Sequence, residues 1–384
     1  MTKDLKILFP ILHNYLNYDE NHGIEIISTG VNSSSISKKP SLLKHYYVNE
    51  ETEKIIINNI KWAQGEITKP IFQFAYLMLP TKCNQSCKGC FMGQDKSNLP
   101  EYYDGSDFSE RELYEICSFL RNHGAKSVVY GGVGELFNWK GAFKFIEIIQ
   151  SYGLDIVIFT NGTLLSQDDV IRLNEAGVTL IISLRDTIEK FHNQFVGTNN
   201  FLKSLLSIEY ALSIGMQEDN RLSVEIPVTK LNGKRVLLNF IPAMRGLGIV
   251  PMVEEYIQIS VSNEEQALSH DFKEAREFIN LSRNLDMKLG VNWIPEVGTR
   301  IIGQPKCKRP LYSFAIFPNR NIMDCPSHSV SYGNLFKNSI DEIIYSDNFR
   351  NEILNFSLCA CSVFYTNSNL DLPVRLPNYL EALI

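Results

Sequence analysis

Three cysteines with the spacing of a metal site, Cys83, Cys87 and Cys90, directly follow an apolar run. Cysteine thiolates are the usual ligands of iron–sulfur clusters, and a cubane [4Fe–4S] cluster has one iron more than this segment has thiols. An iron without a protein ligand can bind a small molecule, as catalytic zinc ions do at their open position. The spacing therefore predicts a reactive iron–sulfur cluster. Zinc, or a structural cluster with a fourth ligand from elsewhere in the chain, stays open as an alternative.

A second group of cysteines comprises Cys307, Cys325, Cys359 and Cys361. In a reducing compartment, clustered cysteines bind metal more often than they form disulfides. Four thiols fit one further [4Fe–4S] cluster, and a zinc site with four cysteines is the alternative. The eighth cysteine, Cys117, lies on an apolar face of a predicted helix, where we expect it to be a buried small side chain.

A repeated pattern of strand and helix must position these cysteines. Six apolar runs typical of buried strands alternate along the sequence with segments that have a helical period. This order predicts an α/β fold with a parallel sheet. Six units fall short of the eight of a closed barrel, so we expect a partial (β/α)6 barrel. The predicted strands are 72–79, 127–130, 155–159, 179–183, 222–228 and 251–259, and the predicted helices are 110–122, 143–152, 166–175, 201–214, 234–247 and 263–285.

The pattern also predicts three parts of the chain. Residues 1–70 are polar and form an N-terminal extension with a helix near 51–64, residues 71–295 form the partial barrel, and residues 296–384 carry the second cysteine group.

Composition excludes several classes of protein. Hydrophobic residues make up 44% of the 384 residues and charged residues 21%, which suits a globular core. The net charge of −6 gives no electrostatic reason to expect nucleic acid as a partner. Neither a membrane-spanning run nor a signal peptide is evident, so we expect a cytoplasmic protein with no membrane partner.

The triad resembles a known signature. Cys-x3-Cys-x2-Cys after the first strand is similar to the motif of the radical S-adenosylmethionine (SAM) superfamily, and further segments match it in order. The resemblance implies that the open iron binds the amino and carboxylate groups of SAM. Reduction of the cluster by an external donor such as flavodoxin or ferredoxin would then cleave SAM. The products would be methionine and a 5′-deoxyadenosyl radical that abstracts a hydrogen atom from the substrate.

Glycines and a carboxylate at the end of the second strand resemble the Gly-Gly-Glu-Pro segment of that family. They are Gly131, Gly132, Gly134 and Glu135, followed by Leu136 where the family has proline. Glycines allow the backbone to approach a ligand closely. The resemblance implies that the Glu135 carboxylate binds the ammonium group of SAM.

The next two strand ends carry further matches. Thr160 and Asn161 belong to a Thr-Asn-Gly segment, and Ser183 matches a serine that contacts SAM in relatives. Arg185 and Asp186 depart from the usual Asp-Gly, so we assign no role to either. Weaker matches are His192 and Asn232.

The C-terminal cysteines resemble the auxiliary-cluster module called SPASM or, in its shortened one-cluster form, Twitch. A hairpin with a Pro-Asp-Gly turn is typical of this module, and Arg320 replaces the turn glycine here. A full SPASM module has more cysteines, so we expect the short form. The family usually has Cys-x2-Cys where this chain has Cys359 and Cys361, which leaves open whether both bind the second [4Fe–4S] cluster.

Together these features predict a radical SAM oxidoreductase whose auxiliary cluster accepts an electron. The extension of residues 1–70 could hold a leader segment, which favours modification of a peptide, of the RiPP or maturase type. Modification of a small sugar or aminocyclitol is the alternative. A non-catalytic zinc or iron–sulfur protein is a remote one.

Overall fold

Two compact units, each made of three segments, form the chain. The computed structural model describes residues 2–28, 50–79, 82–88, 90, 107–131, 134–255, 284, 309–326 and 331–355. Unit 1 comprises Met1–Leu42, Cys83–Lys96 and Ile158–Ile294, and unit 2 comprises Leu43–Lys82, Ser97–Val157 and Pro295–Ile384. None of the helices in the described ranges has the length and apolar character needed to cross a membrane.

The sheet of unit 2 has the strand order β11-β10-β9-β3-β4. Strand β3 (Phe74–Leu77) pairs in parallel with both β4 (Ser127–Tyr130) and β9 (Ser313–Ile316). Strands β10 (Asn321–Met323) and β11 (Ser331–Asn334) continue from β9 in antiparallel pairs. Every residue of β3, β4 and β9 is buried, as expected for parallel strands covered on both faces.

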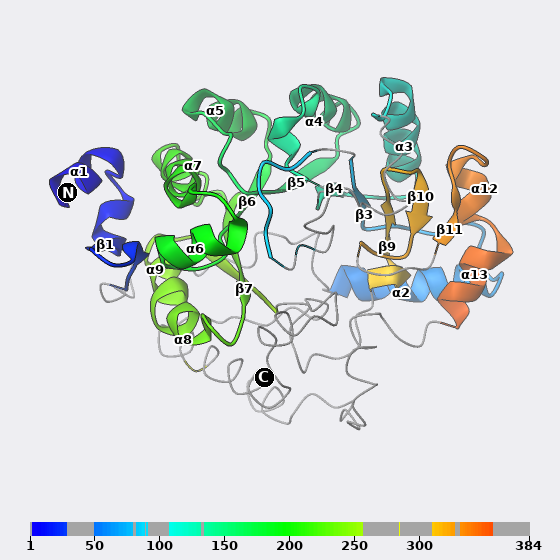
Figure 1. The fold of residues 1–384 in the computed structure, drawn as a ribbon. Helices are drawn as coiled ribbons and strands as arrows, with labels where there is room; N and C mark the ends of the chain where they lie inside the picture. Colours follow the sequence, from blue (N-terminus) through cyan, green and yellow to red (C-terminus); the bar gives the residue numbers. More distant parts are fainter. Residues whose placement is uncertain are drawn as a thin grey trace. The chain divides into compact units, whose positions relative to one another are not determined.

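Helices cover this sheet (Figure 1). Helix α2 (Glu50–Ala63) packs against α13 (Asp347–Leu354), where the Trp62 ring meets Phe349 edge to face. Helix α3 (Glu110–Asn122) contacts both α4 (Ala142–Ser151) and α12 (Ile340–Ile344). Cys117 on α3 is fully buried, which confirms that it is a core side chain, and this burial raises the pKa of its thiol to about 12.

Unit 1 contains the other parallel strands. β6 (Thr179–Ser183), β7 (Leu222–Val228) and β8 (Val250–Glu255) pair in this order, and β5 (Asp155–Thr160) crosses the boundary between the units. The six strands β3 to β8 confirm the predicted α/β fold with a mostly parallel sheet. The predicted helix 263–285 falls almost wholly outside the described residues. The other helices of unit 1 are α5 (Gln167–Glu175), α6 (Glu189–Val196), α7 (Phe201–Ser213), α8 (Gly233–Arg235) and α9 (Ile241–Gly246).

Helices α8 and α9 are joined by a π-helical turn, Val236–Phe240, within the helix predicted at 234–247. Pro242 lies in the first turn of α9. Because proline has no N–H and its ring clashes with the carbonyl group of the preceding turn, an unbroken α-helix is strained there. Widening of the turn before the proline relieves this strain.

The N-terminal segment of unit 1 contains elements that the sequence pattern did not predict. They are α1 (Thr2–Leu8), a short 3-10 helix (Leu12–Tyr15) and a hairpin of β1 (Leu16–Asp19) and β2 (Gly23–Ile26). The buried Glu209 carboxylate on α7 accepts the N–H groups of Ile11 and Leu12 at 2.7 and 2.8 Å. Helix α2 belongs to unit 2, so the first part of the chain contributes to both units. The predicted domain limits stay a prediction.

In unit 2, Arg320 fixes the hairpin of β9 and β10 to the start of α3. Its backbone has a φ of 66°, in the left-handed region that costs a non-glycine residue about 1–2 kcal/mol. Its buried guanidinium pairs with Glu112 at 2.8 Å and donates to the carbonyl oxygens of Pro318 and Asp107 at 2.6 and 2.8 Å. It also stacks on Phe108, 3.9 Å from the ring centroid. These contacts offset the backbone strain, so arginine can occupy the turn position where the related module has glycine.

We expect Arg320→Gly to lower the free energy of unfolding by about 2–4 kcal/mol, because the lost charge-assisted hydrogen bonds outweigh the relieved strain. Asn220 is a matched control, since it also has a left-handed backbone, with a φ of 56°. Asn220→Gly should change stability by about 1 kcal/mol or less. Urea unfolding of the three proteins measures the difference. Equal stability of Arg320→Gly and the parent would show that the guanidinium contacts contribute nothing.

Candidate functional site

The triad loop, residues 83–90, is anchored by its backbone to the end of α6 in unit 1. The N–H groups of Ser86 and Lys88 donate to the carbonyl oxygens of Val196 and Phe195 at 3.0 and 2.8 Å. The last carbonyl groups of a helix have no partner within the helix, so they are available to a neighbouring loop. Helix α6 therefore holds the backbone between the cysteines. The sequence pattern did not predict this helix.

Three polar side chains close a ring of hydrogen bonds between the triad loop and the end of β5. Asn84 Nδ2 donates to Thr163 Oγ1 at 2.7 Å, Thr163 Oγ1 donates to Asn161 Oδ1 at 2.6 Å, and Asn161 Nδ2 donates to Asn84 Oδ1 at 2.8 Å. The Asn161 carbonyl oxygen also accepts the hydroxyl of Ser204 on α7 at 2.7 Å. The ring uses both the donor and the acceptor of each side-chain group, so it fixes the orientation of all three.

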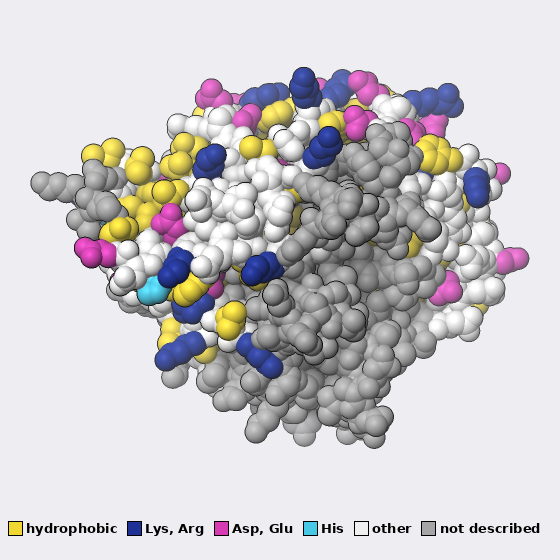
Figure 2. Space-filling view, in the orientation of Figure 1, with side chains coloured by type: hydrophobic (Ala, Val, Ile, Leu, Met, Phe, Trp, Pro, Cys, Tyr) yellow, Lys and Arg dark blue, Asp and Glu magenta, His cyan; other side chains and the backbone are white. Residues whose placement is uncertain are grey.

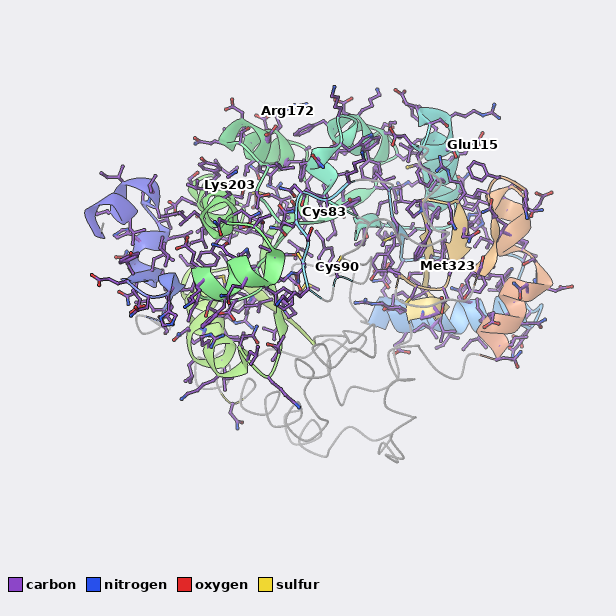
Figure 3. The ribbon with its side chains drawn as sticks, viewed as in Figure 1. Cys83, Cys90, Glu115, Arg172, Lys203 and Met323 are labelled. Atoms are coloured by element: carbon purple, nitrogen blue, oxygen red, sulfur yellow. The ribbon has the colours of Figure 1, made fainter. Side chains whose placement is uncertain are left out.

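The Cys87 thiol lies in a partly buried environment near the other two cysteines. Burial raises its pKa to about 11, the Arg185 guanidinium opposes this shift, and the charges of Cys90 and Cys83 add to it. Its Sγ also donates to Gln85 Oε1 at 3.4 Å. Figure 3 shows Cys83 and Cys90 on the same loop. The described residues contain no group of three Cys, His, Asp or Glu side chains close enough to count as a formed metal site.

Arg185 lies two residues after the end of β6, and its positive charge lowers the pKa of the Cys87 thiol against the effect of burial. Its guanidinium donates to both carboxylate oxygens of Glu225 on β7, at 3.2 and 3.3 Å. Burial alone would lower the pKa of Arg185, but Glu225 and the thiolates of Cys87 and Cys90 raise it well above its ordinary value. The guanidinium therefore stays charged next to the cysteines.

Two positions that matched the family weakly hold the backbone of Arg185. Its N–H donates to His192 Nδ1 at 3.2 Å, and its carbonyl oxygen accepts from Asn232 Nδ2 at 3.3 Å. Burial, together with the Arg185 charge, lowers the pKa of His192 to about 3, so the ring is neutral and can accept this hydrogen bond. The neighbouring Asp186 forms a separate ion pair with Arg235 at 2.6 Å.

Sequence reasoning missed the role of Arg185, although one signal was available. Glu225 is the one charged residue of β7 (Leu222–Val228), in which every residue is buried. A buried carboxylate needs a positive partner or a set of hydrogen-bond donors. Searching the strand ends for a basic residue would have identified the partner, because parallel strands present their carboxyl ends on one edge.

Glu135 belongs to unit 2. Its side chain is buried and caps a short 3-10 helix, Leu136–Asn138, by accepting the Phe137 N–H at 3.3 Å. Its own N–H and the Asn138 side chain both donate to the Lys82 carbonyl oxygen, at 3.3 and 3.0 Å. Lys82 directly precedes Cys83 in the sequence.

Two of the three glycines before Glu135 lie within the described residues, and each has a different neighbour. The Gly134 carbonyl oxygen accepts the Tyr130 hydroxyl at 3.3 Å. Gly131 faces the Tyr76 ring, which a Cβ there would contact at an ordinary 3.5 Å. Gly132 lies outside the described residues.

Of the remaining predicted site residues, the structure describes Thr160, Ser183 and Cys325. Thr160 is buried and its hydroxyl accepts the Gly162 N–H at 3.0 Å, while Ser183 is half-buried at the end of β6. Cys325 is buried just after β10, and its N–H donates to Asp324 Oδ1 at 2.9 Å. The other cysteines of the second group lie outside the described residues: Cys307, Cys359 and Cys361.

The donor set around the triad fits an iron–sulfur cluster. Three thiols on one loop supply the ligands that such clusters take. The partly buried Arg185 guanidinium has the sign that offsets the negative charge of thiolates and cluster. The same thiols suit zinc, so the donor set alone does not select the metal.

Comparisons with known proteins identify the family of this region. The family described as the radical SAM superfamily matches residues 77–232. A curated protein of Pyrococcus furiosus, the tungsten-containing aldehyde ferredoxin oxidoreductase cofactor-modifying protein, is 26% identical over 200 residues, which are 48% of this chain and 54% of the relative. The chain therefore spans about half the length of this curated relative.

Solved structures share the fold. Streptococcus suis SuiB bound to precursor peptide SuiA matches with a TM-score of 0.60 at 15% identity, over 81% of this chain and 75% of that chain. The anSMEcpe protein with bound AdoMet matches with a TM-score of 0.57 at 16% identity, over 75% of this chain and 81% of that chain. Identities this low establish similarity of fold.

The hydrogen-bonded ring predicts the behaviour of a Thr163→Val variant. Valine keeps the shape of threonine but removes both ring bonds of Oγ1, so the triad loop should open more readily. A loss of about 1–2 kcal/mol corresponds to amide exchange about 5- to 30-fold faster at Ser86 and Lys88. Thr187→Val is the matched control, because the Thr187 hydroxyl is buried without a hydrogen-bond partner. Exchange rates in Thr163→Val equal to those of this control would show that the ring does not hold the loop.

Proposed function

Because residues 77–232 form a radical SAM domain, we propose that Cys83, Cys87 and Cys90 hold a [4Fe–4S] cluster that binds SAM, and that the protein abstracts a hydrogen atom from its substrate. The observation that carries this proposal is the triad loop itself, which two backbone hydrogen bonds anchor to the end of α6. When bound, the cluster supplies the electron that cleaves SAM to methionine and a 5′-deoxyadenosyl radical.

The residues of the chain would bind and orient SAM around that cluster. Glu135 offers a buried carboxylate for the ammonium group of SAM, and its backbone is tied to the residue before Cys83. Gly131, Gly132 and Gly134 would let the backbone approach the ligand closely. In unit 1, the polar groups that we propose for SAM are Thr160, Asn161 and Ser183. The ring with Asn84 holds Asn161 in place.

We propose that the substrate is a peptide and that the reaction is an oxidative modification of the RiPP or maturase type. Two proteins of similar fold support it. SuiB is bound to precursor peptide SuiA in one structure, and anSMEcpe is bound to the Cp18Cys peptide in another, which matches this chain with a TM-score of 0.54 at 15% identity. The curated relative is named as a cofactor-modifying protein, in keeping with a role in maturation.

We propose that a Twitch-like module holds a second [4Fe–4S] cluster, with ligands from Cys307, Cys325, Cys359 and Cys361. The hairpin of β9 and β10 supports it, because its turn at Arg320 has the left-handed backbone that the related module obtains from glycine. Cys325 follows this hairpin in a buried position. A fully ligated cluster there would accept the electron left on the substrate after hydrogen abstraction, which makes the net reaction an oxidation.

An external one-electron donor such as flavodoxin or ferredoxin would supply the reducing electron. Lys and Arg side chains gather over α6 and α8 in Figure 2, although the chain as a whole is acidic. The exposed lysines of this part of unit 1 are Lys88, Lys190, Lys230 and Lys234. An acidic donor protein would be attracted to this face by complementary charge.

Iron analysis tests the assignment of the two clusters. The parent should hold about eight irons per chain after anaerobic reconstitution, and the triple variant of Cys83, Cys87 and Cys90 to Ala about four. The triple variant should form no 5′-deoxyadenosine, whereas Cys117→Ala, which changes a core cysteine outside both groups, should match the parent. Cleavage of SAM that persists in the triple variant would overturn the assignment of the triad. A colourless, zinc-loaded parent would overturn it as well.

SAM affinity tests Glu135. Glu135→Gln keeps the cap of the 3-10 helix but removes the charge, so SAM binding should weaken by about 1.5–3 kcal/mol with unchanged iron content. Glu115→Gln is the matched control, since Glu115 lies exposed on α3 (Figure 3). Isothermal titration of the reconstituted proteins with SAM compares them. Equal affinity of the Glu135 variant and the parent would place this carboxylate outside the SAM site.

A further inference from the structure

The helical segment that follows β7 presents two leucines to solvent. Leu231 is 67% exposed and Leu238 53% exposed. The Gly233 N–H donates to the Thr229 carbonyl oxygen at 3.1 Å, so helical hydrogen bonding begins before α8 and continues into the π-helical turn. About two helical turns separate the leucines, which places them on the same side of the segment. They therefore form one exposed apolar strip.

Lysines lie beside this strip. Lys234 stands between the two leucines in the sequence, and Lys190 lies on α6. Both are exposed, and neither forms an ion pair with a described residue. Arg235 joins α8 to α6, because its guanidinium lies 5.0 Å from the centroid of the Phe191 ring. Figure 2 shows hydrophobic side chains among Lys and Arg side chains over these helices.

The carboxylates on and just before α6 are directed to other partners. Asp186 forms a bidentate pair with Arg235, at 3.1 and 2.6 Å. The Glu189 carboxylate accepts a backbone N–H of β2 at 2.9 Å, so it faces the hairpin. The exposed charged residues of α6 and α8 are Lys190 and Lys234. The face of these two helices is therefore positive toward solvent.

Helix α6 also connects this face to the triad loop. Lys88 is exposed on that loop, and its N–H donates to the Phe195 carbonyl oxygen at 2.8 Å. Phe191, near the other end of α6, contacts α8 through Arg235. The helix has 8 residues and is about 12 Å long. Because electron transfer slows steeply with distance, a protein that reduces the triad cluster must dock near that loop, and the face of α6 and α8 meets this requirement.

We propose that Leu231, Leu238, Lys190 and Lys234, here called the donor surface, bind a small acidic protein of the flavodoxin or ferredoxin class that reduces the triad cluster. Complementary charge guides the two proteins together, and burial of the leucines holds them. The whole chain has a net charge of −6, so this basic face is a local exception that suits an acidic partner. The inference rests on the proposed function, because it requires a cluster that accepts the electron.

SAM cleavage driven by a protein donor or by a chemical reductant tests the donor surface. Reconstituted full-length protein and SAM are mixed anaerobically with dithionite, reduced flavodoxin or reduced ferredoxin, and 5′-deoxyadenosine is quantified. The double variant Lys190→Glu and Lys234→Glu should need about tenfold more protein donor for half the maximal rate at low salt, and high salt should reduce this difference. With dithionite, which needs no docking, this variant should match the parent.

The double variant Leu231→Ser and Leu238→Ser tests the apolar strip. It should also need about tenfold more protein donor, at low and at high salt, because the lost contacts are apolar. The matched controls are charge reversal of Arg172 on α5 together with Lys203 on α7 (Figure 3), and Ile7→Ser, at a position on α1 that is 76% exposed. Both controls should match the parent. Biolayer interferometry with the oxidised donors should show the same differences as changes in Kd.

Three results would overturn the inference. The first is equal donor dependence and Kd for the parent and both double variants of the donor surface. The second is a lower rate with dithionite at unchanged donor dependence, which would assign these residues to the substrate or to the fold. The third is a parent that dithionite activates and neither protein donor does. A parent that cleaves no SAM with any reductant would instead overturn the proposed function.

Discussion

The hydrogen bonds that anchor the triad loop are the interactions on which the described site depends. A short loop with three thiols has little structure of its own. It obtains a defined position from the end of α6, whose carbonyl oxygens accept the N–H groups of Ser86 and Lys88, and from the ring around Asn161. The Arg185 guanidinium forms an ion pair with Glu225 on β7, and its positive charge opposes the rise in the pKa of Cys87.

Much of the fold could be predicted from the sequence, because periodicity and capping residues are local signals. Helix α3 begins and ends where it was expected, since Ser109 and Glu112 form a capping box at its start. The central strands were recognisable as apolar runs, and β6 and β7 have the predicted bounds. The hairpin of β1 and β2 could not be predicted in this way, because its strands of four residues are too short to show a period. A distant side chain contributes instead, because the Glu189 carboxylate on α6 accepts the Ile24 N–H of β2 at 2.9 Å.

Contacts between distant residues explain what else the sequence did not reveal. The partner of Asn84 lies 77 residues away at Asn161, and Arg185 is 40 residues from Glu225. The motifs indicated the cysteines and the neighbouring polar residues, but not that Asn161 orients the triad loop. In the same way, Arg320 was visible as a departure from glycine, and its contacts with Glu112, two carbonyl oxygens and the Phe108 ring explain how the turn tolerates it.

The central claim is that the triad makes this protein a SAM-cleaving enzyme, and product analysis tests it most directly. Purified, reconstituted protein is incubated anaerobically with SAM and dithionite, and methionine and 5′-deoxyadenosine are quantified by mass spectrometry over time. The account predicts that both products form in equal amounts, and only when reductant is present. An iron-loaded protein that binds SAM and is reduced, yet forms neither product, would contradict it.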